Sequence, residues 1–265
     1  MVIIETTSLS RRFGEVLAVD AVTMSVEAGE AFGLLGRNGA GKSTVIKILT
    51  TLLPPTSGTA AVAGYDVVRQ PEEVRQNIGY VPQMISADGT LTGYENVLVF
   101  AKLYGVPRLE REARVRDALA FMGLQEAASK LVRDYSGGMI RLLEIAQATL
   151  HRPRVLFLDE PTIGLDPLSR QTVWEHLEQL RFEYGTTMFL TTHDMEEADA
   201  LCDRLSIMHQ GKLVVTGTPE ELKAVIGPGV SLSDVFIHYT GAGLGETGGG
   251  YREAARTRYT ARRLG

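Results

Sequence analysis

The segment GRNGAGKST, residues 36–44, constrains the fold of this chain more than any other feature. It follows AFGLL, which has the composition of a buried strand. It precedes KSTVIKILTTLL, which has the pattern of a helix that Pro54 and Pro55 should end. A glycine, four residues and then Gly-Lys-Ser form the P-loop pattern, which needs a strand before it and a helix after it. We therefore expect an α/β sheet built around this loop.

Phosphate binding explains the residue types in the loop. Its glycines let backbone N–H groups approach an anion closely, and the helix that follows directs its positive end at the same point. Lys42 is expected to neutralise β- and γ-phosphates, and Ser43 to offer its hydroxyl to Mg²⁺. The predicted nucleotide-binding residues of the loop are Gly36, Arg37, Asn38, Gly39, Ala40, Gly41, Lys42, Ser43 and Thr44.

The segment VLFLDE, residues 155–160, predicts the second half of such a site. Its continuous apolar run is typical of a strand buried in a parallel sheet, and ligands bind at the carboxyl ends of such strands. Asp159 is then placed to hold Mg²⁺, and Glu160 to polarise the water that attacks the γ-phosphate. A strand ending in two acids is weak evidence alone, but it is strong evidence when a P-loop precedes it.

The segment DYSGGMIRLLEIAQATL, residues 134–150, supplies a second helix start suited to an anion. Ser136, Gly137 and Gly138 would leave several N–H groups exposed there. One nucleotide in one chain does not need two γ-phosphate cradles. Two chains packed head to tail would place each Ser136–Gly138 against the nucleotide on the other chain's P-loop. The alternative is an ordinary serine-capped helix.

The rest of the chain predicts an α/β fold: a P-loop NTPase core with an antiparallel β edge subdomain and an inserted α-helical subdomain. Alternating β-rich runs before residue 30 indicate the antiparallel edge, and residues 84–150 carry helical periodicity. We expect the nucleotide-binding domain to span residues 1–225. A short accessory helix follows at 226–240, where Leu232, Val235 and Phe236 lie at helical spacing, and it either folds back on the domain or is a plain C-terminal packing helix. Residues 241–265 are predicted to form a flexible Gly-rich and basic tail.

Composition narrows the class of protein further. Apolar residues make up 44% and charged residues 22%, which is typical of a globular domain. A net charge of -5 argues against a nucleic-acid partner. The single cysteine, Cys202, cannot form an intrachain disulfide, and no apolar run approaches the roughly 20 residues of a membrane span. We therefore expect a cytoplasmic protein that reaches a membrane only by docking on a partner.

Taken in order, residues 36–44, 135–139 and 155–161 resemble the P-loop, signature and Walker B motifs of ABC ATPases, and the resemblance covers roughly residues 2–225. It implies four further roles. Phe13 would stack on adenine, and Gln83 would sense Mg²⁺ and the γ-phosphate. The loop of Gly164, Leu165 and Asp166 would cross a dimer interface, and His193 would contact the γ-phosphate. Alternatively, Phe13 is a core aromatic, Gln83 caps a loop and His193 is structural.

Three sequence segments resemble those of the ATPases of ABC-2-type exporters, including daunorubicin-resistance-like and sodium-export-like subunits. The segments are EPTIGLDP, YSGGM and SLSDVFIHYTG. This resemblance implies ATP and Mg²⁺ as cofactors, a second copy of the chain as partner, and an ABC-2-type permease that holds the protein at the cytoplasmic face of the membrane. The cargo would be a drug, lipid, ion or other small solute.

The same resemblance assigns catalytic roles to Glu160, His193 and Gln83, and metal binding to Ser43, Gln83 and Asp159. The sequence departs from the family pattern at Arg37, where proline is common, and at Ile140 and Leu142, where polar residues are common.

Three other classes compete with this interpretation. A soluble ABC ATPase acting on ribosomes or DNA usually carries a second such domain or a long coiled coil, for which this chain has no room. A P-loop kinase or GTPase would leave Ser136–Gly138 and His193 unexplained. A regulatory subunit would bind nucleotide without turnover.

Overall fold

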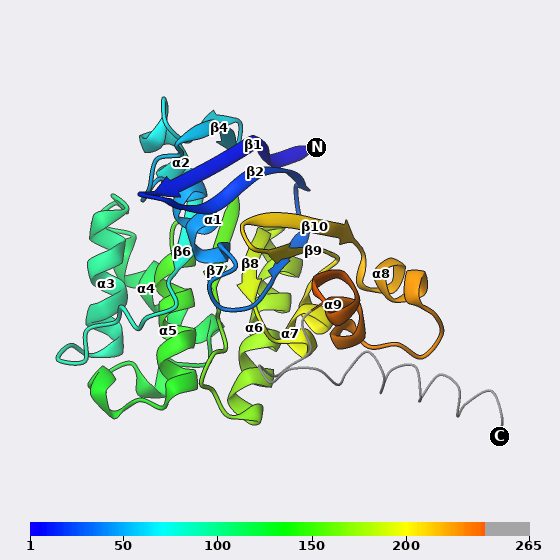
Figure 1. The fold of residues 1–265 in the computed structure, drawn as a ribbon. Helices are drawn as coiled ribbons and strands as arrows, with labels where there is room; N and C mark the ends of the chain where they lie inside the picture. Colours follow the sequence, from blue (N-terminus) through cyan, green and yellow to red (C-terminus); the bar gives the residue numbers. More distant parts are fainter. Residues whose placement is uncertain (242–265) are drawn as a thin grey trace, which may run out of the picture.

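The computed structural model describes residues 1–241, so the predicted tail lies outside the described residues except for Gly241. Two sheets and the helices around them form the fold (Figure 1). The strands are β1 (Val2–Phe13), β2 (Val16–Glu27), β3 (Ala31–Leu35), β4 (Ser57–Val62), β5 (Tyr65–Asp66), β6 (Ile78–Val81), β7 (Val155–Asp159), β8 (Thr187–Thr192), β9 (Arg204–His209) and β10 (Lys212–Gly217). The α-helices are α1 (Lys42–Leu49), α2 (Pro71–Asn77), α3 (Gly93–Leu103), α4 (Arg111–Phe121), α5 (Gly137–Thr149), α6 (Pro167–Tyr184), α7 (Met195–Leu201), α8 (Pro219–Ile226) and α9 (Leu232–Thr240).

The strand order confirms the predicted fold class. One sheet has the order β10-β9-β3-β8-β7-β6 and is parallel from β9 to β6, with β10 antiparallel to β9. The other has the order β2-β1-β4-β5 and is antiparallel throughout. Figure 1 shows the antiparallel sheet above α1 and the helices α3, α4 and α5 grouped beside the parallel sheet.

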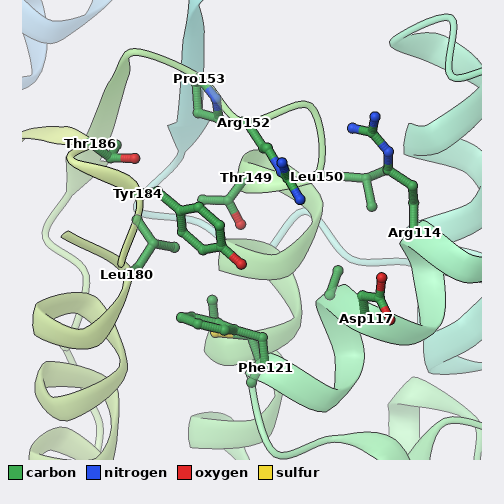
Figure 2. Close-up of a pocket in the computed structure, with 12 residues that line it drawn as sticks. Arg114, Asp117, Phe121, Thr149, Leu150, Arg152, Pro153, Leu180, Tyr184 and Thr186 are labelled. Carbon is green, nitrogen blue, oxygen red and sulfur yellow. The ribbon is translucent and has the colours of Figure 1, made fainter. Parts of the chain in front are cut away.

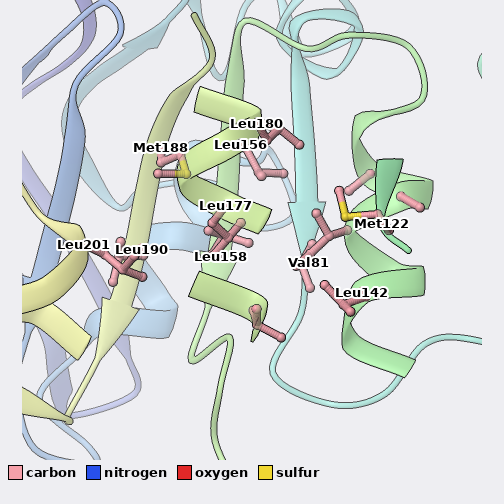
Figure 3. Close-up of a cluster of buried hydrophobic side chains, with 14 of the residues drawn as sticks. Val81, Met122, Leu142, Leu156, Leu158, Leu177, Leu180, Met188, Leu190 and Leu201 are labelled. Carbon is pink, nitrogen blue, oxygen red and sulfur yellow. The ribbon is translucent and has the colours of Figure 1, made fainter. Parts of the chain in front are cut away.

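The parallel sheet is buried on both faces, as its continuous apolar strands require. Phe157 and Phe189 pack on the side of α1 and the antiparallel sheet. Their neighbours Leu158 and Leu190 point to the opposite side and join the core formed with the helices (Figure 3). The carboxyl ends of β3, β7 and β8 are thereby held side by side, which is where an α/β sheet binds its ligand.

The same core explains the two apolar departures in the signature helix. Leu142 of α5 is buried and belongs to the cluster that includes Val81 at the end of β6 (Figure 3). Ile140 is half-buried and packs against this cluster. Both side chains therefore contribute to the packing of α5 against the sheet.

Helix α1 is shorter than the sequence predicts. It ends at Leu49, well before Pro54. The Thr50 hydroxyl donates back to the Ile46 carbonyl at 2.8 Å, and Thr51 adopts a left-handed conformation with φ 64°. The chain turns at these two threonines, so the prolines do not end the helix.

Both the predicted helical stretch at residues 84–150 and the predicted accessory helix contain α-helices. The first α-helix in residues 84–150 begins at Gly93, where Thr92 and Glu95 form a capping box. Near the C-terminus, α9 buries Leu232, Val235 and Phe236 against the helical side of the core, so this helix folds back on the domain. None of the helices in residues 1–241 combines the length and the hydropathy needed to cross a bilayer.

Candidate nucleotide-binding site

The P-loop connects β3 to α1 and has the backbone that an anion cradle needs. Gly41 is the N-cap of α1 with φ 110°, and a Cβ there would lie 2.3 Å from the Ala18 carbonyl oxygen. Within residues 1–241 the amides of Gly39, Gly41 and Lys42 have no hydrogen-bond acceptor. Unpaired amides at the positive end of a helix fit phosphate oxygens. The side chains of Arg37 and Asn38 are exposed, so Arg37 does not disturb the loop.

Asp159 lies at the end of β7 and meets the P-loop helix. Its Oδ1 accepts hydrogen bonds from Ser43 Oγ at 3.0 Å and from Thr191 Oγ1 at 2.6 Å. Thr191 is buried in the neighbouring strand β8, which fixes the carboxylate between β7 and α1. Two of the three predicted metal ligands, Ser43 and Asp159, are therefore in direct contact.

Glu160 links the cation of the P-loop to His193. The residue is only 4% exposed, and Oε1 lies 3.0 Å from Lys42 Nζ. Its other oxygen, Oε2, is hydrogen-bonded to His193 Nδ1. Glu160 adopts a left-handed φ of 53°, and its amide donates to the Thr191 carbonyl at 3.0 Å. Such strain in a non-glycine residue persists only where the surrounding structure fixes it, as at many functional sites.

The donor set suits a small divalent cation that binds together with phosphate. Ser43 and Asp159 supply hard oxygen ligands. No cluster of three or more His, Cys, Asp and Glu side chains that could hold a metal exists in the described part of the chain. Mg²⁺ in nucleotide enzymes needs one or two carboxylates plus the substrate's phosphates, and that matches what is present here.

Within residues 1–241, no hydrogen bond or ion pair joins Phe13 or Gln83 to the cluster around Lys42 and Glu160. Phe13 ends β1 with 46% of its surface exposed, which excludes the core alternative, and the Arg11 guanidinium lies 4.7 Å from its ring centroid. Gln83 follows β6, the strand next to β7, and its side chain is exposed. Its backbone carbonyl accepts a hydrogen bond from Arg141 of α5 at 3.2 Å.

The signature segment lies beside the predicted interface loop, away from the P-loop. Ser136 is exposed and caps α5 by accepting from the Met139 amide. A Cβ on Gly137 would lie 3.2 Å from Leu165, and one on Gly138 would lie 2.9 Å from Ser169. No hydrogen bond or ion pair joins residues 136–138 to residues 36–44 among the described residues. The fold thus groups one set of motifs around Lys42 and a second set around Ser136.

Asp166 has a structural role in addition to its predicted place at an interface. It caps α6 by accepting from the Leu168 and Ser169 amides. Hydrogen bonds from Ser169 lower the pKa of the Asp166 carboxyl, which therefore stays ionised at the helix N-terminus. Gly164, two residues earlier, is exposed with φ 74°.

The sequence did not identify Thr191, Arg141 or Glu144 as part of this region. Thr191 is a polar residue inside a buried apolar strand, and Arg141 and Glu144 are charges inside a helix whose other residues are mostly buried. A polar residue in an apolar element was the available signal.

A separate cavity lies at the opposite end of the strands. It is lined by side chains from α4, α6 and the loop before β7, among them Arg114, Phe121, Arg152 and Tyr184 (Figure 2). Its volume of about 70 Å³ has room for only a few water molecules. A nucleotide does not fit there.

The sequence matches known proteins over most of its length. The profile of the family described as ABC transporter matches residues 19–163. The chain is 38% identical over 243 residues to the linearmycin resistance ATP-binding protein LnrL of Bacillus subtilis, covering 92% of this chain and 76% of that protein. It is 43% identical over 227 residues to the daunorubicin/doxorubicin resistance ATP-binding protein DrrA of Streptomyces peucetius, covering 86% of this chain and 68% of that protein.

Solved structures share the fold. An ATP-binding subunit of an ABC transporter superposes with a TM-score of 0.79 at 30% identity, covering 89% of this chain and 99% of that one. A dimeric, post-hydrolysis ATP-binding cassette bound to ADP and Pi superposes with a TM-score of 0.73 at 25% identity, covering 82% of this chain and 98% of that one.

Proposed function

The chain belongs to the ABC transporter family of ATP-binding proteins, and from this premise we propose that two copies close around two ATP molecules to drive a separate membrane permease. It is an ATPase of exporter type. The separation of the motifs carries the proposal: Lys42, Asp159 and Glu160 form one cluster, and Ser136 lies exposed at the start of a helix elsewhere.

Within one chain, we assign the chemistry to the contacting residues around Lys42 and to two residues farther from it, Phe13 and Gln83. Lys42 and the loop amides bind the phosphates, and Phe13 stacks on the adenine ring. Glu160 orients and polarises the attacking water, and His193 on its other oxygen fixes the position of that carboxylate. Ser43, Asp159 and Gln83 would hold Mg²⁺, which when bound supplies neutralisation of charge on the phosphates.

The second copy supplies what one chain lacks. Ser136 and Gly138 present a helix N-terminus, and Gly164 to Asp166 lie next to it on the same part of the surface. A head-to-tail dimer places this surface over the partner's bound nucleotide, so that ATP lies between the chains. The solved cassette to which this chain is similar is dimeric and bound to ADP and Pi, which supports a dimer of this chain.

Mixing two defective variants tests whether the site is shared. Lys42→Ala removes the phosphate cation. Ser136→Asp keeps a good N-cap but adds a negative charge facing the partner's phosphates. Each variant alone should be inactive, whereas an equal mixture should recover about a quarter of wild-type ATPase activity, since a mixed dimer contains one intact site. The matched control is Ser231→Asp, at the N-cap of α9, which should remain active. A mixture no more active than its components contradicts the shared site.

The names of two relatives support a class of cargo. Two similar proteins are named for resistance to linearmycin and to daunorubicin and doxorubicin, so we infer that this chain powers export of a drug or other small solute. Met84 and Ile85, directly after Gln83, expose apolar side chains and offer a docking surface for an ABC-2-type permease. The chain would then sit at the cytoplasmic face of the membrane.

Affinity purification from detergent-solubilised membranes tests the partner. A tagged chain should retain one integral membrane protein with several hydrophobic spans, and Met84→Asp with Ile85→Asp should release it without loss of ATP binding. Recovery of ribosomes or DNA in place of a membrane protein would contradict the proposal.

A further inference from the structure

A buried ion pair in α5 fixes the backbone of the Gln83 loop. Arg141 and Glu144 are 5% and 3% exposed, and Arg141 Nη1 lies 2.9 Å from Glu144 Oε2. The same guanidinium donates to the carbonyl oxygens of Pro82 at 2.8 Å and Gln83 at 3.2 Å. On the other side, Glu144 Oε1 accepts from the amide and the hydroxyl of Ser86, at 2.5 Å and 2.9 Å.

These contacts are the whole hydrogen-bonded support of the loop. No other hydrogen bond involves residues 82–87 in the part of the chain that the structure describes. The segment has no regular secondary structure, and its side chains at Met84 and Ile85 face solvent. The hydrogen bonds that hold the backbone at Gln83 therefore come from α5.

Helix α5 is also the helix that Ser136 caps at its N-terminus. Arg141 lies five residues beyond that cap, about 7.5 Å along the helix axis. Helix α5 thus connects two functions. At its start, Ser136 is proposed to contact the partner's nucleotide. About one turn and a half further on, Arg141 holds the Gln83 loop, which is proposed to sense the nucleotide of its own chain.

A stability role alone does not account for a charge pair at this place. The neighbours Leu142, Leu143 and Ile145 are buried apolar residues. Replacing a buried ion pair by apolar residues is often neutral or stabilising, so burial of Arg141 and Glu144 does not by itself show that the pair stabilises the fold.

We propose that Arg141 and Glu144 are positioning residues that make Gln83 and Ser136 move as one body, and so couple the nucleotide site of each chain to that of its partner. The inference rests on the proposed shared sites. It adds that the coupling passes through α5 and this ion pair.

The test replaces the pair without leaving a lone buried charge. The double variant Arg141→Met, Glu144→Leu keeps the core apolar. Its matched control is Arg116→Met, Glu112→Leu, which removes an exposed ion pair from α4. For the first double variant we expect folding, an ATP Kd within about threefold of wild type, a kcat at least about tenfold lower, and a Hill coefficient for ATP that falls toward 1. The control should match wild type. Wild-type kcat and Hill coefficient in the first double variant would overturn the proposal.

A distance measurement gives a result that does not depend on activity. Spin labels at Met84→Cys and Leu103→Cys report the loop against α3, which packs on α5, and both sites are exposed. The native Cys202 is buried and should not react. One narrow distance is expected with the ion pair and a broad distribution without it; identical distributions would overturn the proposal even if the wild type proved to have no cooperativity.

A single substitution on the surface tests the same proposal if the double variant does not fold. Ser86→Ala removes one of the two donors to Glu144 Oε1 from an exposed residue. It should lower kcat about threefold and broaden the label distance while the protein stays folded. Unchanged kcat and unchanged distances in Ser86→Ala would likewise overturn the proposal.

Discussion

Replacing Lys42 with alanine removes the cation at the centre of the site. Lys42 Nζ donates to the Gly36 carbonyl at 2.7 Å and lies 3.0 Å from Glu160 Oε1, and the side chain is 5% exposed. We expect bound ATP to replace these partners with phosphate oxygens. A hydrogen bond to a charged group contributes about 1.5–3 kcal/mol. Because about 1.4 kcal/mol corresponds to a tenfold change in Kd, the variant should bind ATP about 10- to 100-fold more weakly.

The same variant should also lose stability without nucleotide. Glu160 would keep His193 as its partner but would lose its buried cation. Removing one member of a buried ion pair costs about 3–5 kcal/mol when nothing replaces it, and His193 should reduce this loss. Calorimetric titration with ATP and thermal unfolding measure the two effects. Lys47→Ala, an exposed change on the same helix, is the matched control. ATP binding by Lys42→Ala within threefold of wild type would refute the reasoning.

Three further changes test other parts of the account. Phe13→Ala should weaken ATP binding about two- to tenfold in the same titration through lost stacking, whereas the exposed Phe182→Ala should not; equal Kd values would remove Phe13 from the site. Phe236→Ala should destabilise the protein to chemical denaturation by about 3–5 kcal/mol if α9 belongs to the core, with the exposed Ile237→Ala as the small-effect comparison; equal effects would argue against that packing. Burial raises the pKa of Glu197, so the folded protein binds this proton more tightly than the unfolded chain does. Its contribution to stability is then complete below pH 4.5 and declines as pH rises toward the folded pKa. Glu197→Gln should therefore gain stability relative to wild type across that window, and a pH-independent difference would contradict the sign.

Sequence reasoning succeeded where a motif imposes its own local geometry. The order of AFGLL, the P-loop and the next segment predicted a strand, a loop and a helix, and the structure has them. The apolar run of VLFLDE predicted a buried strand with its acids at the carboxyl end. It failed at the end of α1, because a hydroxyl bond from Thr50 and a left-handed Thr51 end the helix before the prolines. Such local competition between side chain and backbone is hard to weigh from sequence.

The contacts between distant segments were not predictable in the same way. The bond from Thr191 to Asp159 and the pairing of Lys42 with Glu160 depend on how β8, β7 and α1 pack. The contacts of Arg141 and Glu144 with the loop after β6 could not be predicted, because they depend on that loop lying against α5. Spacing along the chain carries no information on these distances.

The molar mass of a hydrolysis-blocked variant tests the central claim most directly. Glu160→Gln should keep the shape of the site and bind ATP without turnover. Light scattering with ATP and Mg²⁺ should then give about twice the 28.9 kDa of one chain, and about 28.9 kDa with ADP. A single-chain mass at saturating ATP and Mg²⁺ would contradict the claim that each nucleotide is bound between two copies.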